Sequence, residues 1–486
     1  MKSANASNKI KRKVTNVFFL LLFFLFVLSR PGICRMREAP KSFTAGCLAL
    51  SKVNRVNTNK VNECGDSVKE CSVVKEDTIS FQPFIFATCY AVEICTNNNS
   101  GTWESLEDSS NLWRVCIISE GALSLNLGIT LFKLPEGAKL WVYNYAADYV
   151  EGPYTDKDGM NHALWTPILP GDKIVTEIYV PPGIPKETVD VCITKVNHSF
   201  RDIIGGGLGV ETRAPCNVDV VCPEGEPWRD QIRSVAHYTI NGTYKCSGVL
   251  LNNTSGNFVP FFLTACHCKV NKENAHTMVL YWNHQSPNCS GCLKNSLPGS
   301  LAHNQVGAIF LASWNNDKGS DFALVRLKDR PDPLYNVYYS GWDATGNIPK
   351  SAVCIHHPIF SAKSINHSCC KIASTKKDSS EEDSDAYYWY IEKWMYGTIQ
   401  DGSSGSGLWD ASTGLCIGQL WGGIQGCNKQ CPCKPGDKPN WYGKFSASWQ
   451  GGGTCDTQLK YWLDPCNKGK LKIEGIDPLY SSSNCK

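Results

Sequence analysis

Three short segments carry side chains that together could hydrolyse a peptide bond. His267 lies in Thr-Ala-Cys-His-Cys after an apolar run, Asp321 lies in Gly-Ser-Asp-Phe before an alternating run, and Ser404 lies in Gly-Ser-Ser-Gly-Ser. Serine is a poor nucleophile unless a base takes its proton and a carboxylate orients that base. These residue types predict a catalytic triad of His267, Asp321 and Ser404.

The order of the three residues narrows the class of enzyme. An α/β-hydrolase places its histidine after the serine, whereas no histidine follows Ser404 in this chain. The order His, Asp, Ser is that of chymotrypsin. Gly402 suits a tight turn, and the N–H groups of Gly402 and Ser404 could form an oxyanion hole. Taken alone, Asp321 reads equally as a capping turn, and residues 402–407 as a flexible Gly/Ser loop.

Two cysteine patterns allow a different reading, as metal ligands. One is Cys266-His-Cys268, and the other is Cys427-x3-Cys431-x-Cys433. No matching second ligand pair stands out near either, and cysteines in an oxidising compartment pair with one another. We therefore expect disulfides, no metal and no cofactor. A thiol nucleophile is disfavoured for the same reason.

The elements that must position these residues are short strands. The chain has 486 residues, of which 42% are hydrophobic and 19% charged, so it can form two or three globular domains. The net charge of +3 offers no basic field for nucleic acid. Turn-punctuated apolar runs predict a β-rich, sandwich-like domain at about 100–200 and a double β-barrel over 214–466. The predicted fold class is all-β.

The N-terminus and the cysteine count indicate secretion. Residues 17–28 form an apolar run behind a basic stretch, which predicts a signal peptide over 1–34, or else an uncleaved anchor. The chain has 25 cysteines, and loss of Cys34 with the signal would leave an even number. No later stretch is apolar enough to span a bilayer. Glycosylation sequons occur at Asn98, Asn197, Asn241, Asn252, Asn253, Asn288 and Asn366.

A glycine-rich stretch, Gly205-Gly-Gly-Leu-Gly, separates the two predicted domains. It predicts an accessible cleavage region between a pro-region over 35–213 and the protease domain, or else a linker that is never cut. Residues 467–486 read as a C-terminal tail.

Several longer motifs follow one another in a fixed order along the chain. They are Cys216-Asn-Val-Asp-Val-Val-Cys, Thr264-Ala-Cys-His-Cys, Gly319-Ser-Asp-Phe, Ser340-Gly-Trp-Asp, Ile355-His-His-Pro, Gly402-Ser-Ser-Gly-Ser, Gly418-Gln-Leu-Trp-Gly-Gly and Trp462-Leu-Asp-Pro. In these motifs the chain resembles the lysyl endopeptidase family, bacterial secreted proteases of the chymotrypsin-like clan. The resemblance covers nearly all of 216–465 and extends into the region upstream.

The resemblance implies the same triad, protein or peptide substrates and a pro-region removed during maturation. Ser403 stands before the nucleophile where trypsin-type zymogens have an aspartate, so activation by an ion pair to a new N-terminus is not expected. The pro-region is instead expected to block the site or to assist folding. By matching position the resemblance also implies the disulfides Cys216–Cys427, Cys222–Cys289 and Cys246–Cys268.

The predicted substrate pocket departs from the family. A lysine side chain needs an acidic partner when buried, and the position matching the family's acid is Asn440. Thr398 stands where trypsin has its pocket aspartate, and Trp421 and Gly422 match a pocket wall, although Trp421 also reads as a core aromatic. Asp437 is the nearest acid in sequence. We therefore predict weak or absent lysine preference, and the rival function is an inactive, protease-like binding protein.

Overall fold

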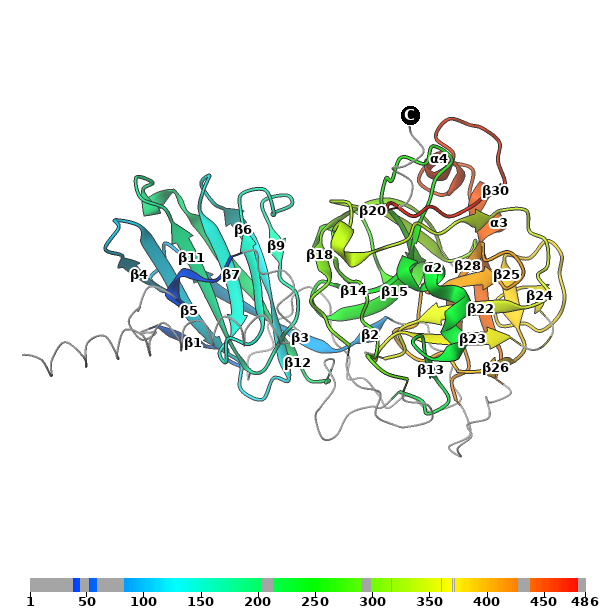
Figure 1. Cartoon of the computed structure of the whole chain (residues 1–486), viewed down its shortest axis with the longest axis horizontal. Helices are drawn as coiled ribbons and strands as arrows, with labels where there is room; N and C mark the ends of the chain where they lie inside the picture. The colour runs from blue at the N-terminus through cyan, green and yellow to red at the C-terminus, as the bar shows by residue number, and fades with distance from the viewer. Residues whose placement is uncertain are drawn as a thin grey trace, which may run out of the picture.

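The computed structural model describes residues 38–43, 52–58, 83–202, 213–289, 299–315, 317–359, 361–368, 370, 372–426 and 438–479. The predicted signal peptide, the glycine-rich linker, Cys427 and Asp437 lie outside these residues. The described chain forms two β-rich units that lie side by side (Figure 1).

The N-terminal unit is a sandwich of two mainly antiparallel sheets. The first sheet has the order β1 (Val53–Arg55), β5 (Asn111–Ile118), β11 (Lys173–Val180), β7 (Lys139–Asn144), β8 (Val150–Tyr154), with β4 (Thr102–Ser105) beside β5. The second has the order β10 (Leu169–Pro170), β6 (Ser124–Lys133), β12 (Asp190–Ser199), β3 (Ala87–Cys95), with β9 (Leu164–Trp165) beside β6.

The core of this unit comes from apolar side chains that both sheets turn inward. Val115 and Ile178 of the first sheet belong to the same buried cluster as Leu127 and Ile193 of the second. Two sheets rich in β-branched residues typically pack face to face and bury the side chains of their inner faces. The sandwich-like region predicted from the sequence is therefore confirmed.

The C-terminal unit contains two larger sheets. The described strands of one run β18 (Asn304–Val306), β17 (Val279–Tyr281), β14 (Val235–Ile240), β15 (Tyr244–Leu251), β16 (Phe261–Ala265), β20 (Phe322–Leu327), β19 (Ala308–Trp314). Those of the other run β13 (Val218–Asp219), β23 (Ser364–Ser368), β22 (Ala352–His356), β27 (Gly407–Asp410), β28 (Cys416–Gly423), β29 (Asn440–Lys444), β25 (Tyr388–Ile391), β24 (Ile372–Thr375), with β21 (Trp342–Asp343), β26 (Trp394–Tyr396) and β30 (Lys472–Ile473) attached.

Helices are short in the described chain. They are η1 (Lys41–Phe43), η2 (Lys186–Thr188), η3 (Pro223–Trp228), α2 (Arg229–Ser234), η4 (Cys266–Cys268), η5 (Ala275–Thr277), η6 (Pro333–Tyr335), α3 (Phe445–Gln450) and α4 (Lys460–Leu463). No helix in these ranges is long and apolar enough to cross a bilayer.

The two sheets of the C-terminal unit share one hydrophobic core. Leu263 and Leu324 from the first sheet lie in the same buried cluster as Val353, Ile355 and Trp409 from the second. This pair of sheets, curled around a common core, confirms the predicted all-β, chymotrypsin-like fold. A site between the sheets can draw on rigid strands from both.

The segment predicted as a C-terminal tail contains a strand, β30, that pairs with this sheet. In β30, Lys472 and Ile473 pair with Asp343 and Trp342 of β21. The Ile476 N–H donates to the carbonyl of Tyr339 at 2.8 Å. These contacts anchor the segment to the second sheet, which short-range sequence patterns do not indicate.

The two units meet along β2 (Phe84–Ile85), which lies between β1 and β3 of the sandwich in sequence but pairs with β15 of the C-terminal unit (Figure 1). Around it, Trp165 and Ile168 of the sandwich share a buried cluster with Val279 and Tyr281. The backbone N–H of Ile168 donates to the Tyr281 hydroxyl at 3.0 Å. The N-terminal unit therefore docks by strand addition and an apolar contact.

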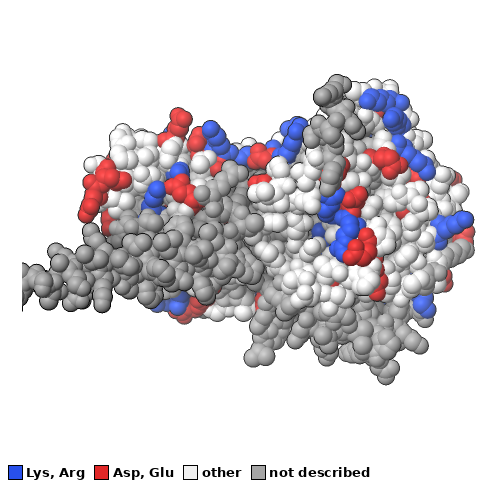
Figure 2. Space-filling model, in the orientation of Figure 1, with Lys and Arg blue, Asp and Glu red and all other residues white. Residues whose placement is uncertain are grey.

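On the face seen in Figure 2, acidic and basic side chains are interspersed.

Candidate active site

His267 is held at the end of a fully buried strand. Strand β16 ends at Ala265, and the short turn η4 (Cys266–Cys268) then places His267 at the seam between the sheets. A disulfide from Cys268 to Cys246 ties this turn to β15. The histidine therefore sits on a turn that is fixed from both sides.

Asp321 orients the ring of His267. The Asp321 carboxylate lies 2.6 Å from Nδ1 of His267 and also accepts the His267 backbone N–H at 3.0 Å. An ionised carboxylate only accepts hydrogen bonds, so Nδ1 carries the proton and Nε2 presents its lone pair. Asp321 has φ of +60° and is fully buried, and the bond from the Cys266 N–H to its carbonyl stabilises that conformation.

Ser404 lies in a tight loop packed against the strands that lead to His267. The Ser247 N–H donates to the Ser404 carbonyl at 2.9 Å, and the Ser247 hydroxyl donates to the Gly402 carbonyl at 2.8 Å. A Cβ on Gly405 would come within 2.2 Å of the Thr264 hydroxyl, so the loop backbone approaches β16 as closely as glycine allows. No hydrogen bond joins Ser404 Oγ to His267 Nε2 in this structure. Within the described chain, His267 Nε2 is buried without a hydrogen-bond partner.

The backbone of this loop presents donors that the protein does not use. Gly402 and Gly405 have φ of +85° and +81°. The N–H groups of Ser403 and Gly405 donate to the carbonyls of Gln400 and Leu420. Within the described chain, the N–H groups of Gly402 and Ser404 donate to no carbonyl. Two such N–H groups beside a nucleophile can bind a developing oxyanion.

A second histidine, His356, supports the loop that carries Ser404, and no sequence pattern predicts this role. His356 Nε2 lies 3.1 Å from Asn366 Oδ1, which only accepts, so Nδ1 accepts the Ser403 hydroxyl at 2.8 Å. Burial is the largest cause that lowers the pKa of His356 to about 3, so the ring stays neutral. The motif Ile355-His-His-Pro contained this residue, but the contact joins segments far apart in sequence.

The predicted pocket residues lie on β28, on β29 and, for Thr398, in the segment before Ser404. Gly423 pairs with Asn440, and Gly422 with Trp441, across the two strands. Asn440 is fully engaged, because its amide nitrogen donates to the carbonyls of Ile424 and Pro439 and its oxygen accepts the indole N–H of Trp394.

Trp421 and Thr398 are also buried. The ring of Trp421 packs edge-on against Tyr388 and Trp441, with centroids 5.8 and 6.2 Å away. The Thr398 N–H donates to Asn217 Oδ1 at 2.8 Å, and its hydroxyl accepts the Gly426 N–H at 3.3 Å. Neither side chain provides a charge for a basic substrate.

Disulfides join Cys222 to Cys289 and Cys246 to Cys268. Cys216 is also disulfide-bonded. Cys266, beside the histidine, has a free thiol. Burial and, secondly, the charge of Asp321 raise its pKa to about 11, so it is not a thiolate nucleophile near neutral pH.

Comparison with known proteins decides the family. Residues 94–200 match the model of the lysyl endopeptidase N-terminal domain, and residues 210–443 match that of the lysyl endopeptidase C-terminal domain. The chain belongs to the lysyl endopeptidase family. It is 25% identical over 362 residues to the lysyl endopeptidase of Pseudomonas aeruginosa, covering 71% of this chain and 75% of that protein. This family member is a serine endopeptidase, a hydrolase of peptide bonds.

Solved protease structures resemble parts of the chain. A Glu endopeptidase in complex with MPD is 16% identical to this chain, with a TM-score of 0.27, and the match covers 49% of this chain and 92% of that structure. The active form of a protease from M. tuberculosis is 12% identical to this chain, with a TM-score of 0.28, and the match covers 50% of this chain and 91% of that structure.

Proposed function

We propose that this family member is made as a secreted precursor and cleaves peptide bonds with Ser404, His267 and Asp321. The observation that carries the proposal is the fixed His267 ring, whose Nδ1 lies 2.6 Å from the Asp321 carboxylate. This contact selects the tautomer that a general base requires. The two N–H groups left unused beside Ser404 support the same chemistry.

In the proposed mechanism, Ser404 Oγ attacks the carbonyl carbon of the scissile peptide bond while His267 Nε2 takes its proton. The N–H groups of Gly402 and Ser404 hold the oxyanion, and Asp321 stabilises the imidazolium. The proton then passes from His267 to the leaving amine, and an acyl-enzyme remains. A water molecule, activated by the same nitrogen, hydrolyses this ester and restores the serine.

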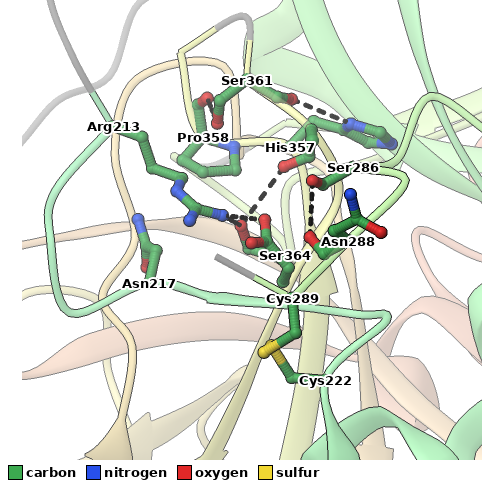
Figure 3. Close-up of polar contacts among 12 residues, drawn as sticks. Arg213, Asn217, Cys222, Ser286, Asn288, Cys289, His357, Pro358, Ser361 and Ser364 are labelled. Atoms are coloured by element: carbon green, nitrogen blue, oxygen red, sulfur yellow. Dashed lines mark hydrogen bonds and ion pairs between the residues drawn. A yellow bond between two sulfur atoms is a disulfide. The ribbon is translucent and has the colours of Figure 1, made fainter. Parts of the chain in front are cut away.

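The segment that begins the catalytic domain supports a maturation step upstream of Arg213. Its guanidinium forms a buried ion pair with Asp219 and donates to the Ser364 hydroxyl at 3.3 Å (Figure 3). The next N–H, that of Ala214, donates to the Gln400 side chain at 2.7 Å. The sequence predicts a domain boundary after residue 213, but the buried ion pair of Arg213 favours a cut before this residue. We therefore expect cleavage between residues 202 and 213. Intact-mass analysis of the mature enzyme tests this, and a chain that starts at Ala214 would contradict it.

We propose that primary specificity has shifted away from lysine. Asn440 carries no charge, and its amide already donates to two carbonyls and accepts from Trp394. A lysine ammonium in that pocket would lack a partner. Cleavage profiling of a peptide library tests this, and strict cutting after lysine would refute it.

Secretion and glycosylation belong to the same proposal. The disulfides support an oxidising compartment. Of the sequons, Asn197, Asn252, Asn253 and Asn366 are buried in the fold, so glycans are expected at the exposed Asn98 and Asn288 instead. Glycopeptide mapping of the secreted protein tests this assignment.

Peptide hydrolysis by single-residue variants tests the enzyme against the rival, an inactive binding protein. We expect Ser404→Ala to reduce kcat by roughly 10⁶-fold and His267→Ala by a similar factor. Ser412→Ala is the matched control, because Ser412 is an exposed turn serine that bonds only to Asp410 among described residues. Mature wild-type protein that hydrolyses no peptide would favour the binding protein.

A further inference from the structure

Three histidines other than His267 gather in the interior of the C-terminal unit. His237 lies on β14, His284 follows β17, and His357 follows β22. Each ring offers one nitrogen, and the three nitrogens lie within 4.8 Å of one another. All three side chains are buried. Three imidazoles that converge inside a protein form a typical donor set for a transition metal.

The hydrogen bonds of the cluster leave ring lone pairs facing inward. His357 Nδ1 lies 3.4 Å from the carbonyl of Ser361, so Nδ1 is the protonated nitrogen and Nε2 bears the lone pair (Figure 3). Within the described chain, His357 Nε2 and His284 Nδ1 are buried with no hydrogen-bond partner. A buried polar atom without a partner costs free energy, which a ligand at that atom would recover.

We propose that His237, His284 and His357 bind one zinc ion, with a fourth ligand from outside this set. Zinc accepts tetrahedral coordination by imidazole nitrogens at about 2.0–2.1 Å. The rings of His284 and His357 are stacked with centroids 5.8 Å apart, so they must rotate to bring their nitrogens to one ion. The Ser361 carbonyl fixes the orientation of the His357 ring, as outer groups do in known sites.

Two buried lysines lie next to the cluster. Lys245 donates to the carbonyl of His357 at 2.8 Å, and Lys363 donates to that of Ile232 at 2.6 Å. Burial lowers the pKa of both amines, that of Lys363 to about 7, so neither is a permanent positive charge beside a bound dication. We expect a small fourth ligand, such as hydroxide or chloride.

The proposed zinc site connects to the loop that carries Ser404 through Ser247. The His357 N–H donates to the Ser247 hydroxyl at 3.3 Å, and that hydroxyl donates to the carbonyl of Gly402. The proposed zinc therefore stabilises the loop structurally and takes no part in the reaction. The sequence prediction of no metal considered only closely spaced cysteine patterns, whereas these histidines come from three distant segments.

Metal analysis of the purified full-length chain tests this proposal. After incubation with zinc and gel filtration, we expect one zinc per chain, and cobalt substitution should give the visible spectrum of a tetrahedral site. His284→Phe and His237→Phe keep a ring in place but should weaken zinc binding by roughly 100-fold or more. His303→Phe is the control, because His303 stacks on Tyr335 with centroids 4.8 Å apart, outside the cluster.

Two results would overturn the proposal. One is a wild-type chain that retains no zinc, and the other is zinc that both ring variants retain as tightly as wild type. If the variants do not fold, X-ray absorption of the zinc-loaded wild type still decides, since the proposal requires three imidazole nitrogens at about 2.0–2.1 Å. Each readout is independent of peptidase activity, so failure here leaves the proposed triad untouched.

Discussion

Replacement of Gly405 by alanine tests how the nucleophile loop is positioned. Gly405 has φ of +81°, and an added Cβ would lie 2.2 Å from Thr264 Oγ1, 2.5 Å from the Ser247 carbonyl oxygen and 2.8 Å from the Ala265 nitrogen. Two of these three atoms belong to the backbone of rigid strands. The loop that carries Ser404 must therefore move if alanine is introduced.

Gly453 provides the matched control in the same domain. Its φ of +85° is nearly the same, but nothing lies within 4 Å of an added Cβ. Both alanine variants bear the cost of a left-handed conformation, roughly 1–2 kcal/mol. Only Gly405→Ala adds steric overlap, which typically costs about 1–3 kcal/mol in a packed interior.

The two variants should therefore differ in both stability and activity. Denaturant unfolding should show Gly405→Ala less stable than Gly453→Ala by about 1–3 kcal/mol. Because a shift of about 1 Å in a reacting atom can cost roughly 100-fold, kcat/KM for a peptide ester should fall by that order in Gly405→Ala alone. Equal stability and equal kcat/KM in the two variants would refute the packing argument.

Three further outcomes are expected. Removing the Cys246–Cys268 disulfide by double alanine replacement should lower the unfolding free energy by roughly 3 kcal/mol, measured in urea, and reduce kcat/KM because the bridge fixes His267. Burial lowers the pKa of Lys444 to about 8, so between pH 8 and 10.5 the unfolded chain binds more protons than the folded chain. The free energy of unfolding should therefore rise with pH in this range, by up to roughly 3 kcal/mol, and Lys444→Met should abolish the rise. Asn440→Asp should destabilise by about 1–3 kcal/mol in thermal unfolding, because two carbonyls lose their donor.

The sequence was sufficient for the features that local patterns encode. Alternating apolar runs between turn residues predicted an all-β chain, because a strand with one buried face has a period of two. The proposed triad rests on equally local signals, because the flanking motifs of His267, Asp321 and Ser404 are short and their order excludes the hydrolase arrangement.

Features that depend on long-range contact could not be predicted. The bond between His356 and Ser403, the pairing of Cys95 with Cys192 and the strand after residue 471 each join segments far apart in the chain. Their residue types are ordinary, and only the register of the sheets brings them together. The same holds for the hydrogen bonds of the Asn440 side chain, because its partners Trp394 and Ile424 lie 46 and 16 residues away in the chain.

Covalent labelling of the nucleophile tests the proposed catalytic assignment most directly. The mature enzyme is treated with a fluorophosphonate, and the modified peptide is identified by mass spectrometry. We expect one adduct per chain on Ser404, absent in Ser404→Ala and strongly slowed in His267→Ala, because the serine needs its base. Folded, mature protein that remains unlabelled, or an adduct on another serine, would contradict the assignment.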